Sequence, residues 1–225
     1  MNQTIDDREK FENRINRFET FGRDKIVRLK PYEKIHGNVR DARRMITPDT
    51  WITTDIHITP DKERNQQIID NINNLVGDSG TLLILGDIGN KKLATYDIIA
   101  SEIAKIRTPN KMLILGNHDM YKISDYAAMG FKFVSDEITC TWGNQRVKFT
   151  HTPYPVNPNM INVHGHLHGT SVYGISEYKF ANTRNFYDAY IYWNDTYVRN
   201  KLVVKPTPQG YPPVQQLRDL YKHLK

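Results

Sequence analysis

Two segments of the chain share one pattern, in which an apolar run is followed by glycine and a side chain that carries a metal-ligand oxygen. They are residues 81–87 (TLLILGD) and residues 111–117 (KMLILGN). Runs this apolar are typical of strands buried on both faces of a parallel sheet. Ligands bind just beyond the carboxyl ends of such strands, so Asp87 and Asn117 are predicted to point into one crevice. The pattern restricts this part of the chain to an α/β sheet.

The segments around these strands extend the pattern into a β-α-β-α-β series. Residues 51–54 are predicted to form the first strand. One helix face is indicated by Ile68, Ile69, Ile72, Leu75 and Val76, ending at Gly77, and a second by Leu93, Ile99, Ile103 and Ile106, stopped by Pro109. The second half has short β-rich stretches at residues 138–142, 146–150, 162–164, 171–175 and 188–193, a hairpin at Gly143-Asn144, and a last helix over residues 214–223.

The chain of 225 residues is long enough for one large domain, which we expect over residues 50–225. Residues 1–49 are predicted to be an N-terminal appendage, helical at first and then irregular. It would cover an edge, form a dimer contact or bind a polyanion. The net charge of +6 favours anionic partners. Basic and acidic residues are interleaved in the appendage, however, as on a solvated helix face.

Cys140 is the only cysteine, which excludes an internal disulfide and a cysteine-ligated zinc site. The N-terminal residues lack the apolar stretch of a secretion signal, and no apolar run approaches the ~20 residues that span a bilayer. We therefore expect a cytoplasmic protein with no membrane partner, located in the host cytoplasm if its source is a virus.

Side chains suited to metal binding stand at the ends of the predicted strands. Asp55-Ile56-His57 follows the first strand, Gly116-Asn117-His118-Asp119 follows the third, His151 follows residues 146–150, and His164-Gly165-His166-Leu167-His168 ends the strand at residues 162–164. Residues two apart in an extended chain point to the same side, which pairs Asp55 with His57 and His166 with His168. Each motif alone has a simpler interpretation, because Asp55 and Asp87 would also serve as helix caps.

In this order, and each at a strand end, the motifs resemble those of the calcineurin-like metallophosphoesterase superfamily over about residues 50–195. The resemblance implies an α/β fold with a mixed β-sandwich flanked by helices, in α/β/β/α layers. It implies one metal site formed by Asp55, His57, Asp87 and His168, and another formed by Asp87, Asn117, His151 and His166, with Asp87 as the bridge. His118 would face the phosphate with Asp119 orienting it, and His164 would have no ligand role.

Some details separate the chain from particular branches of that superfamily. The residues after Asp87 lack the Asp-Arg-Gly of the serine/threonine protein phosphatases, which makes a protein substrate less favoured. The chain also lacks the Gly-His that often follows Asp-x-His in small single-domain bacterial and phage members. Residues 185–190 and the Pro213-Val214 segment are nevertheless similar to that small branch.

The chemistry of the residues agrees with this assignment. Two divalent ions bring about +4 and the carboxylates of Asp55 and Asp87 only −2, so the site would stay positive and suit a phosphoryl group. Nitrogen and oxygen ligands favour Mn2+, Fe2+/Fe3+, Zn2+ or Ni2+ over Mg2+ and Ca2+. We expect metal-bound hydroxide to attack phosphorus, while His118 acts as general acid and gives the leaving oxygen its proton.

The preferred hypothesis is a phosphodiesterase or phosphatase that acts on nucleotides or other small phosphate esters. A DNA or RNA nuclease is the first alternative, so nucleic acid stays open as a partner, and it would require a continuous basic groove and steep salt dependence. A non-catalytic scaffold of the same fold is the second, but it should have lost ligands, and all seven and His118 are present. The oligomeric state is left open.

Overall fold

The computed structural model describes residues 35–89, 92–154, 159–168, 186–190, 197–198, 201–202 and 211–221. The chain divides into two compact units, residues 1–34 and 35–225, and the described residues all belong to the second. The appendage helix and the strand predicted at residues 171–175 lie outside the described residues. The predicted boundary between residues 49 and 50 stays a prediction, but a helix at Val39–Met45 (α2) belongs to the second unit and buries Ala42 in its core.

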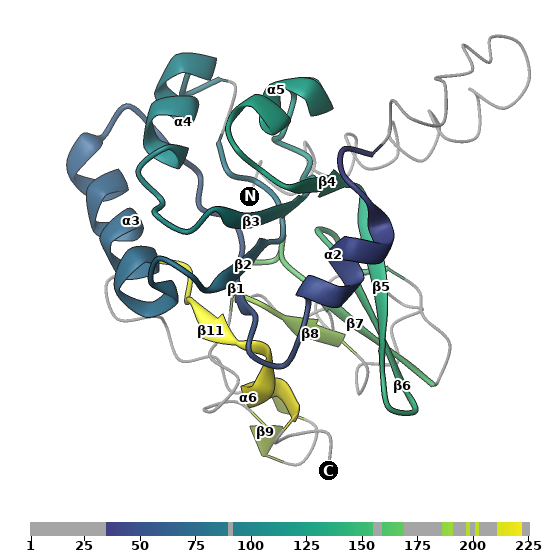
Figure 1. The fold of residues 1–225 in the computed structure, drawn as a ribbon. Coiled ribbons are helices and arrows are strands. Elements are labelled where there is room, and N and C mark those ends of the chain that lie inside the picture. Colours follow the sequence, from purple (N-terminus) through teal and green to yellow (C-terminus); the bar gives the residue numbers. More distant parts are fainter. Residues whose placement is uncertain are drawn as a thin grey trace, which may run out of the picture. The chain divides into compact units, whose positions relative to one another are not determined.

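A five-stranded sheet carries the first half of the described chain (Figure 1). Four strands run parallel in sequence order, namely β1 (Trp51–Thr53), β2 (Thr81–Ile84), β3 (Asn110–Ile114) and β4 (Phe133–Ser135). They are connected by α3 (Lys62–Val76), α4 (Tyr96–Ile103) and α5 (Ile123–Ala128). The short strand β11 (Gln215–Gln216) pairs antiparallel with β1. This is the predicted β-α-β-α-β series with one further unit.

A second sheet follows in the order β5 (Glu137–Trp142), β6 (Gln145–Thr150), β7 (Met160–His164) and β8 (Phe186–Asp188). The first pair is the predicted hairpin, and β6, β7 and β8 are parallel. Two further short strands, β9 (Tyr197–Val198) and β10 (Lys201–Leu202), pair with each other, and a last helix, α6, spans Leu217–Tyr221.

Alternating side chains of β2 divide the core into two apolar clusters. Leu82 and Ile84 pack with residues of α3 and α4, such as Ile69. Leu83 packs with residues of the second sheet, such as Phe149, in a cluster that α2 and α6 also line. Helices, first sheet and second sheet therefore form successive layers, which confirms the predicted α/β fold with mixed sheets flanked by helices.

The helix boundaries follow recognisable local signals. The helix α3 begins at Asp61, whose side chain accepts a hydrogen bond from the Arg64 N–H, and ends at Gly77 with φ 68°, a conformation that glycine adopts without strain. Leu93, predicted to lie on the second helix, is outside α4 and exposed. None of the helices in the described ranges is long and apolar enough to cross a membrane.

Candidate metal centre

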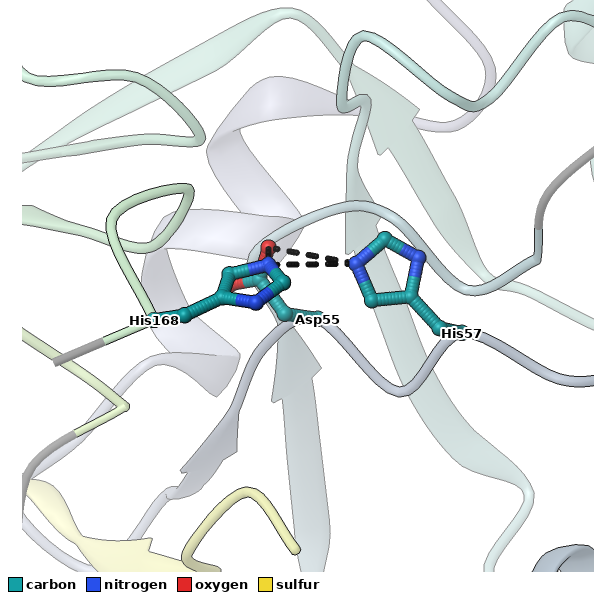
Figure 2. Close-up of side chains that lie close together, drawn as sticks. All are labelled: Asp55, His57 and His168. Atoms are coloured by element: carbon teal, nitrogen blue, oxygen red, sulfur yellow. Dashed lines mark hydrogen bonds and ion pairs between the residues drawn. The ribbon is translucent and has the colours of Figure 1, made fainter. Parts of the chain in front are cut away.

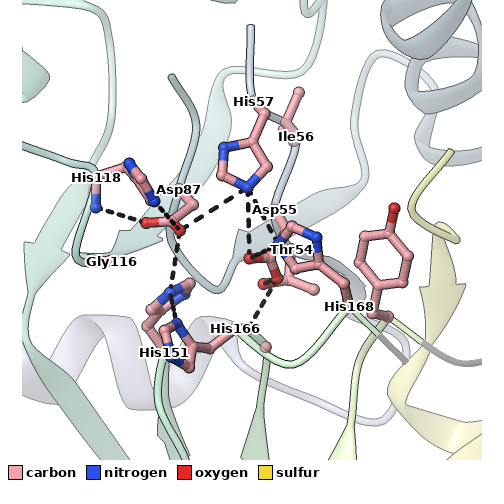
Figure 3. Close-up of polar contacts among 12 residues, drawn as sticks. Thr54, Asp55, Ile56, His57, Asp87, Gly116, His118, His151, His166 and His168 are labelled. Atoms are coloured by element: carbon pink, nitrogen blue, oxygen red, sulfur yellow. Dashed lines mark hydrogen bonds and ion pairs between the residues drawn. The ribbon is translucent and has the colours of Figure 1, made fainter. Parts of the chain in front are cut away.

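Loops at the carboxyl ends of five strands meet at one place (Figure 3). The first sheet contributes the residues after β1, β2 and β3, and the second sheet contributes those after β6 and β7. Together they bring in all seven predicted metal ligands, namely Asp55, His57, Asp87, Asn117, His151, His166 and His168. Parallel strands end on the same edge of a sheet, and this explains why residues so far apart in sequence meet.

One group of metal-ligand atoms belongs to Asp55, His57 and His168 (Figure 2). The His168 Nε2 atom lies 3.1 Å from Asp55 Oδ1 and 3.2 Å from His57 Nε2, and His57 Nε2 lies 3.8 Å from Asp55 Oδ1. The other carboxylate oxygen of Asp55 accepts a hydrogen bond of 2.9 Å from the His166 N–H. Asp55 is buried, whereas the side chain of His168 is half exposed.

A second group belongs to Asp87, His151 and His166, with Asn117 beside it. The His151 Nε2 atom lies 3.3 Å from Asp87 Oδ2, 2.9 Å from Asn117 Oδ1 and 3.3 Å from His166 Nδ1. Asp87 and His151 are both buried. This group therefore lies deeper in the protein than the first.

These atoms fit a metal cation because they bring electron pairs together. The Nδ1 atom of His151 is 2.7 Å from the Leu85 carbonyl oxygen and must carry the hydrogen that this bond needs. In neutral His151 the Nε2 atom then has only a lone pair, and it faces acceptor atoms of Asp87 and Asn117. A metal cation would take the place of the proton that Nε2 carries when His151 is charged, and the lone pair of Nε2 and the neighbouring oxygens would coordinate it.

The Asp87 carboxylate faces both groups. Its Oδ2 atom is 3.3 Å from His151 Nε2 in one group and 3.9 Å from His57 Nε2 in the other. Its Oδ1 atom accepts a hydrogen bond of 2.9 Å from the His118 N–H. Asp87 therefore stands where a ligand shared by two metal ions has to stand, and its bridging role stays a prediction.

In the metal-free protein the pKa values of the site histidines shift in different directions. Burial opposes an imidazolium at His151, but the carboxylates of Asp87 and Asp55 outweigh it and raise the pKa of His151 to about 9. Burial lowers the pKa of His166 to about 4, and the nearby His151 charge adds to the effect. Burial also lowers the pKa of His57, which leaves its ring neutral and able to coordinate a metal.

His118 lies at the edge of the site with 40% of its side chain exposed. Its Nε2 atom is 4.0 Å from Asp87 Oδ2, and its ring packs edge-on against His57 with 5.3 Å between ring centroids. The side chain is outside both ligand groups and open to solvent. Its role as a proton donor stays a prediction.

Asp119 has a different place from the one that the sequence suggested. We predicted that its carboxylate would orient His118, but both oxygens instead accept hydrogen bonds from backbone N–H groups. Oδ2 accepts from Gly116 and from Asp87, each at 2.8 Å, and Oδ1 accepts from Ile88 at 3.1 Å. Loss of hydration and the charge of Asp87 raise the pKa of Asp119 to about 7. Asp119 therefore ties the loop after β3 to the loop after β2.

Tight backbone turns bring the ligands together. Positive φ angles occur at Asp55 (52°), His57 (48°), Asp87 (55°), His166 (70°) and His168 (48°). Glycines allow close approach, because a Cβ atom on Gly165 would lie 2.6 Å from Asp55 Oδ2 and one on Gly86 would lie 2.6 Å from His151 Nδ1.

His164 stays outside both groups, as the resemblance implies. It is buried, its Nδ1 atom lies 2.9 Å from the Gly165 carbonyl oxygen, and burial lowers its pKa to about 4. Two other residues near the site were not anticipated. The Tyr190 ring stacks on His168, with 5.1 Å between centroids and 7° between planes, and Arg64 binds the backbone of the loop after β1. Arg64 belongs to no motif that a single sequence would reveal, and Tyr190 ends the segment 185–190, whose similarity to the small branch gave it no role.

The fold and these residues define an α/β protein with aspartate and histidine groups that could hold metal ions. A sequence model of the family described as calcineurin-like phosphoesterase matches residues 49–222. The chain therefore belongs to the calcineurin-like phosphoesterases, which are metal-dependent phosphoesterases. No curated protein matches the chain.

Solved structures that match part of the chain include a protein of unknown function from Aquifex aeolicus, AQ665, with 18% identity and a TM-score of 0.40 over 52% of this chain and 77% of that one. The phosphoesterase YfcE from E. coli has 18% identity and a TM-score of 0.36 over 53% of this chain and 70% of its own. A predicted phosphoesterase from Streptococcus pneumoniae has 16% identity and a TM-score of 0.29 over 53% of this chain and 63% of its own. At these scores the similarities carry no weight for function.

Proposed function

We propose that this protein is a dinuclear metal phosphoesterase that hydrolyses phosphodiester or phosphomonoester bonds in nucleotides or other small molecules. One observation carries the proposal: the chain has two groups of three metal-ligand atoms, Asp55/His57/His168 and Asp87/His151/His166, and the Asp87 carboxylate of the second group also lies 3.9 Å from His57 Nε2 of the first. The buried free thiol of Cys140 supports a cytoplasmic location.

The ligand set determines the charge of the loaded site. Asp55, His57, Asp87 and His168 would hold one ion, and Asp87, Asn117, His151 and His166 the other. The chain supplies only two carboxylates to these sites, so a pair of divalent ions would leave a positive surplus that attracts an anionic phosphate ester. Two ions bound there would act as Lewis acids and lower the pKa of water toward neutrality.

The remaining roles, proton donation and loop positioning, are assigned to His118 and Asp119. Its exposed position lets His118 donate the proton on Nε2 to the leaving oxygen, as a general acid does near neutral pH. The hydrogen bond from the His118 N–H to Asp87 Oδ1 fixes the distance of this donor from the site. Asp119 holds the same loop through its bonds to Gly116 and Asp87.

Mixed nitrogen and oxygen ligands favour a transition metal, and we propose Mn2+, Fe2+/Fe3+, Zn2+ or Ni2+. The deciding experiment measures metal content by mass spectrometry and follows hydrolysis of an aryl phosphodiester, an aryl phosphomonoester and a nucleotide panel with Mn2+ and with chelator. We expect bound metal and turnover that chelator abolishes. A protein that binds no metal and hydrolyses none of these esters would refute the proposal.

A short oligonucleotide belongs in the same panel. A small-molecule phosphoesterase should hydrolyse nucleotides at rates that depend weakly on salt. A nuclease should prefer the oligonucleotide and lose affinity steeply as salt rises, because phosphate contacts release counterions. Preferential cleavage of the oligonucleotide would refute the proposed small-molecule substrates but would not contradict the proposed metal sites.

A further inference from the structure

We infer that Arg64 is a positioning residue that holds His57 in its metal-binding conformation, an inference that rests on the proposed metal sites. Arg64 lies in the first turn of α3 and contributes no ligand atom. Its Nη1 atom donates to the His57 carbonyl oxygen at 2.9 Å, and its Nη2 atom donates to the Ile56 carbonyl oxygen at 3.0 Å. One guanidinium thus binds two successive carbonyls, one of which belongs to a proposed ligand.

These two carbonyls belong to the peptide planes on either side of the His57 Cα atom. The Ile56 carbonyl is part of the plane that sets φ of His57, and the His57 carbonyl is part of the plane that sets ψ. Because peptide bonds are planar, fixing both planes fixes both dihedral angles and the direction of the Cα–Cβ bond. The guanidinium therefore helps to set the direction in which the His57 side chain leaves the backbone.

The opposite edge of each plane is also held. The His57 N–H donates to the Asp87 carbonyl at 2.9 Å, and the Ile58 N–H donates to the Ile88 carbonyl at 2.9 Å. Each plane is bound to the loop after β2 on one edge and to Arg64 on the other. Without Arg64, each plane would keep only one of these attachments.

The backbone conformation explains why both attachments are needed. His57 has a φ angle of 48°, in the left-handed region, which is strained for a residue with a Cβ atom. Hydrogen bonds from a charged donor are stronger than those between neutral groups, and the Arg64 contacts are partly buried. The guanidinium can thus offset the strain that directs His57 Nε2 toward Asp55 and Asp87.

The geometry suits arginine and not lysine. Two parallel N–H groups match two neighbouring carbonyls, whereas an ammonium group is a single point of charge on a flexible stem. The position of Arg64 is also supported by its own surroundings, because α3 buries Ile68 and Ile69 in the core and the guanidinium carbon lies 6.0 Å from the centroid of the Tyr211 ring.

The test is a double-mutant cycle of Mn2+ affinity, measured by titration calorimetry on the full chain. Arg64→Met removes the guanidinium but keeps an unbranched apolar stem. We expect it to weaken Mn2+ binding about 10-fold, the effect typical of residues that support metal ligands. In a His57→Ala background, Arg64→Met should have no further effect, because the residue acts through His57.

Lys62→Met is the matched control, since Lys62 is exposed in the same turn of α3 and its loss removes the same charge. It should leave Mn2+ affinity unchanged. Failure of the wild-type protein to bind Mn2+ would refute the proposed function, and Arg64→Met with wild-type affinity would refute only the role of Arg64. An equal further loss in the His57→Ala background, or the same loss with Lys62→Met, would also overturn the inference, because charge or general stability would then explain it.

Discussion

Replacement of Asp119 by alanine removes the acceptor of three backbone N–H groups in a single step. The carboxylate binds the N–H groups of Gly116, Asp87 and Ile88, and these lie in the loops that carry Asp87 and Asn117. A buried N–H without a partner costs about 1–3 kcal/mol. The upper limit for three such groups is therefore about 9 kcal/mol, as large as the whole stability of many domains.

Part of that loss is offset, because the carboxylate itself is disfavoured where it stands. Loss of hydration and the charge of Asp87 raise the pKa of Asp119 to about 7, so ionised Asp119 is less stable here than in water. We therefore expect Asp119→Ala to lower the free energy of unfolding by about 3 kcal/mol. In Asp119→Asn the amide oxygen can keep two of the bonds, whereas the amide nitrogen faces the third N–H and cannot accept from it. We therefore expect this variant to lose about half as much free energy of unfolding as Asp119→Ala.

The assay is urea unfolding of the metal-free protein at pH 7.5 in chelator, so that lost metal binding does not contribute to the difference. Asp125→Ala is the control, because the partly buried Asp125 side chain accepts one bond from the Lys122 N–H at the start of α5. It should cost about 1 kcal/mol. If Asp119→Ala costs no more than this control, the hydrogen bonds of Asp119 do not hold the two loops.

Three further predictions concern single residues. His118→Ala should lower turnover of esters with poor leaving groups about 10²–10⁴-fold while metal content stays unchanged, and equal loss of both would contradict a proton-donor role. Gly165→Ala should abolish metal binding with little change in far-UV circular dichroism, because the new methyl group would overlap Thr54 Oγ1 and lie 2.6 Å from Asp55 Oδ2; retained metal would refute these contacts. Burial raises the pKa of Cys140 to about 11, so its reaction with Ellman's reagent at pH 8 should be slow until denaturant is added, and a fast native reaction would show that the thiol is accessible.

The sheet that carries the site could be predicted because its strands are apolar on both faces. Leu82, Leu83 and Ile84 are all fully buried, since β2 has helices on one side and a second sheet on the other. Such a strand leaves a continuous apolar run in the sequence. The polar residue that follows it marks the sheet edge, which is why Asp87 could be assigned to the site.

Short helices were harder to predict. The helix α2 spans only Val39–Met45, and its short apolar face consists of Val39, Ala42 and Met45, of which only Ala42 is fully buried. Its start is marked by Asn38, whose side chain accepts hydrogen bonds from the N–H groups of Arg40 and Asp41. A helix this short is stabilised by its contacts with the rest of the core and not by its own sequence.

The hydrogen bonds of Asp119 were not predicted because two of them join residues that are distant in the sequence. Its neighbour His118 suggested a partner one residue away, but the carboxylate turns toward N–H groups that strand pairing brings near. The bond to Asp87 joins residues 32 apart in the sequence, and that to Ile88 joins residues 31 apart. Such contacts depend on how loops cross at the sheet edge, and this is not encoded in local spacing.

The backbone at His57 offers the sharpest test of how the ligands are oriented. His57→Gly and His57→Ala lose the same imidazole and differ by one Cβ atom. At an ordinary position alanine is the more stable by about 0.4–1 kcal/mol, because glycine has more freedom in the unfolded chain. At a φ angle of 48° the order should reverse, with the glycine variant more stable by about 1 kcal/mol in urea unfolding without metal. An alanine variant of equal or greater stability would mean that His57 relaxes to negative φ when no metal is bound, and that the metal, not the fold, imposes the turn.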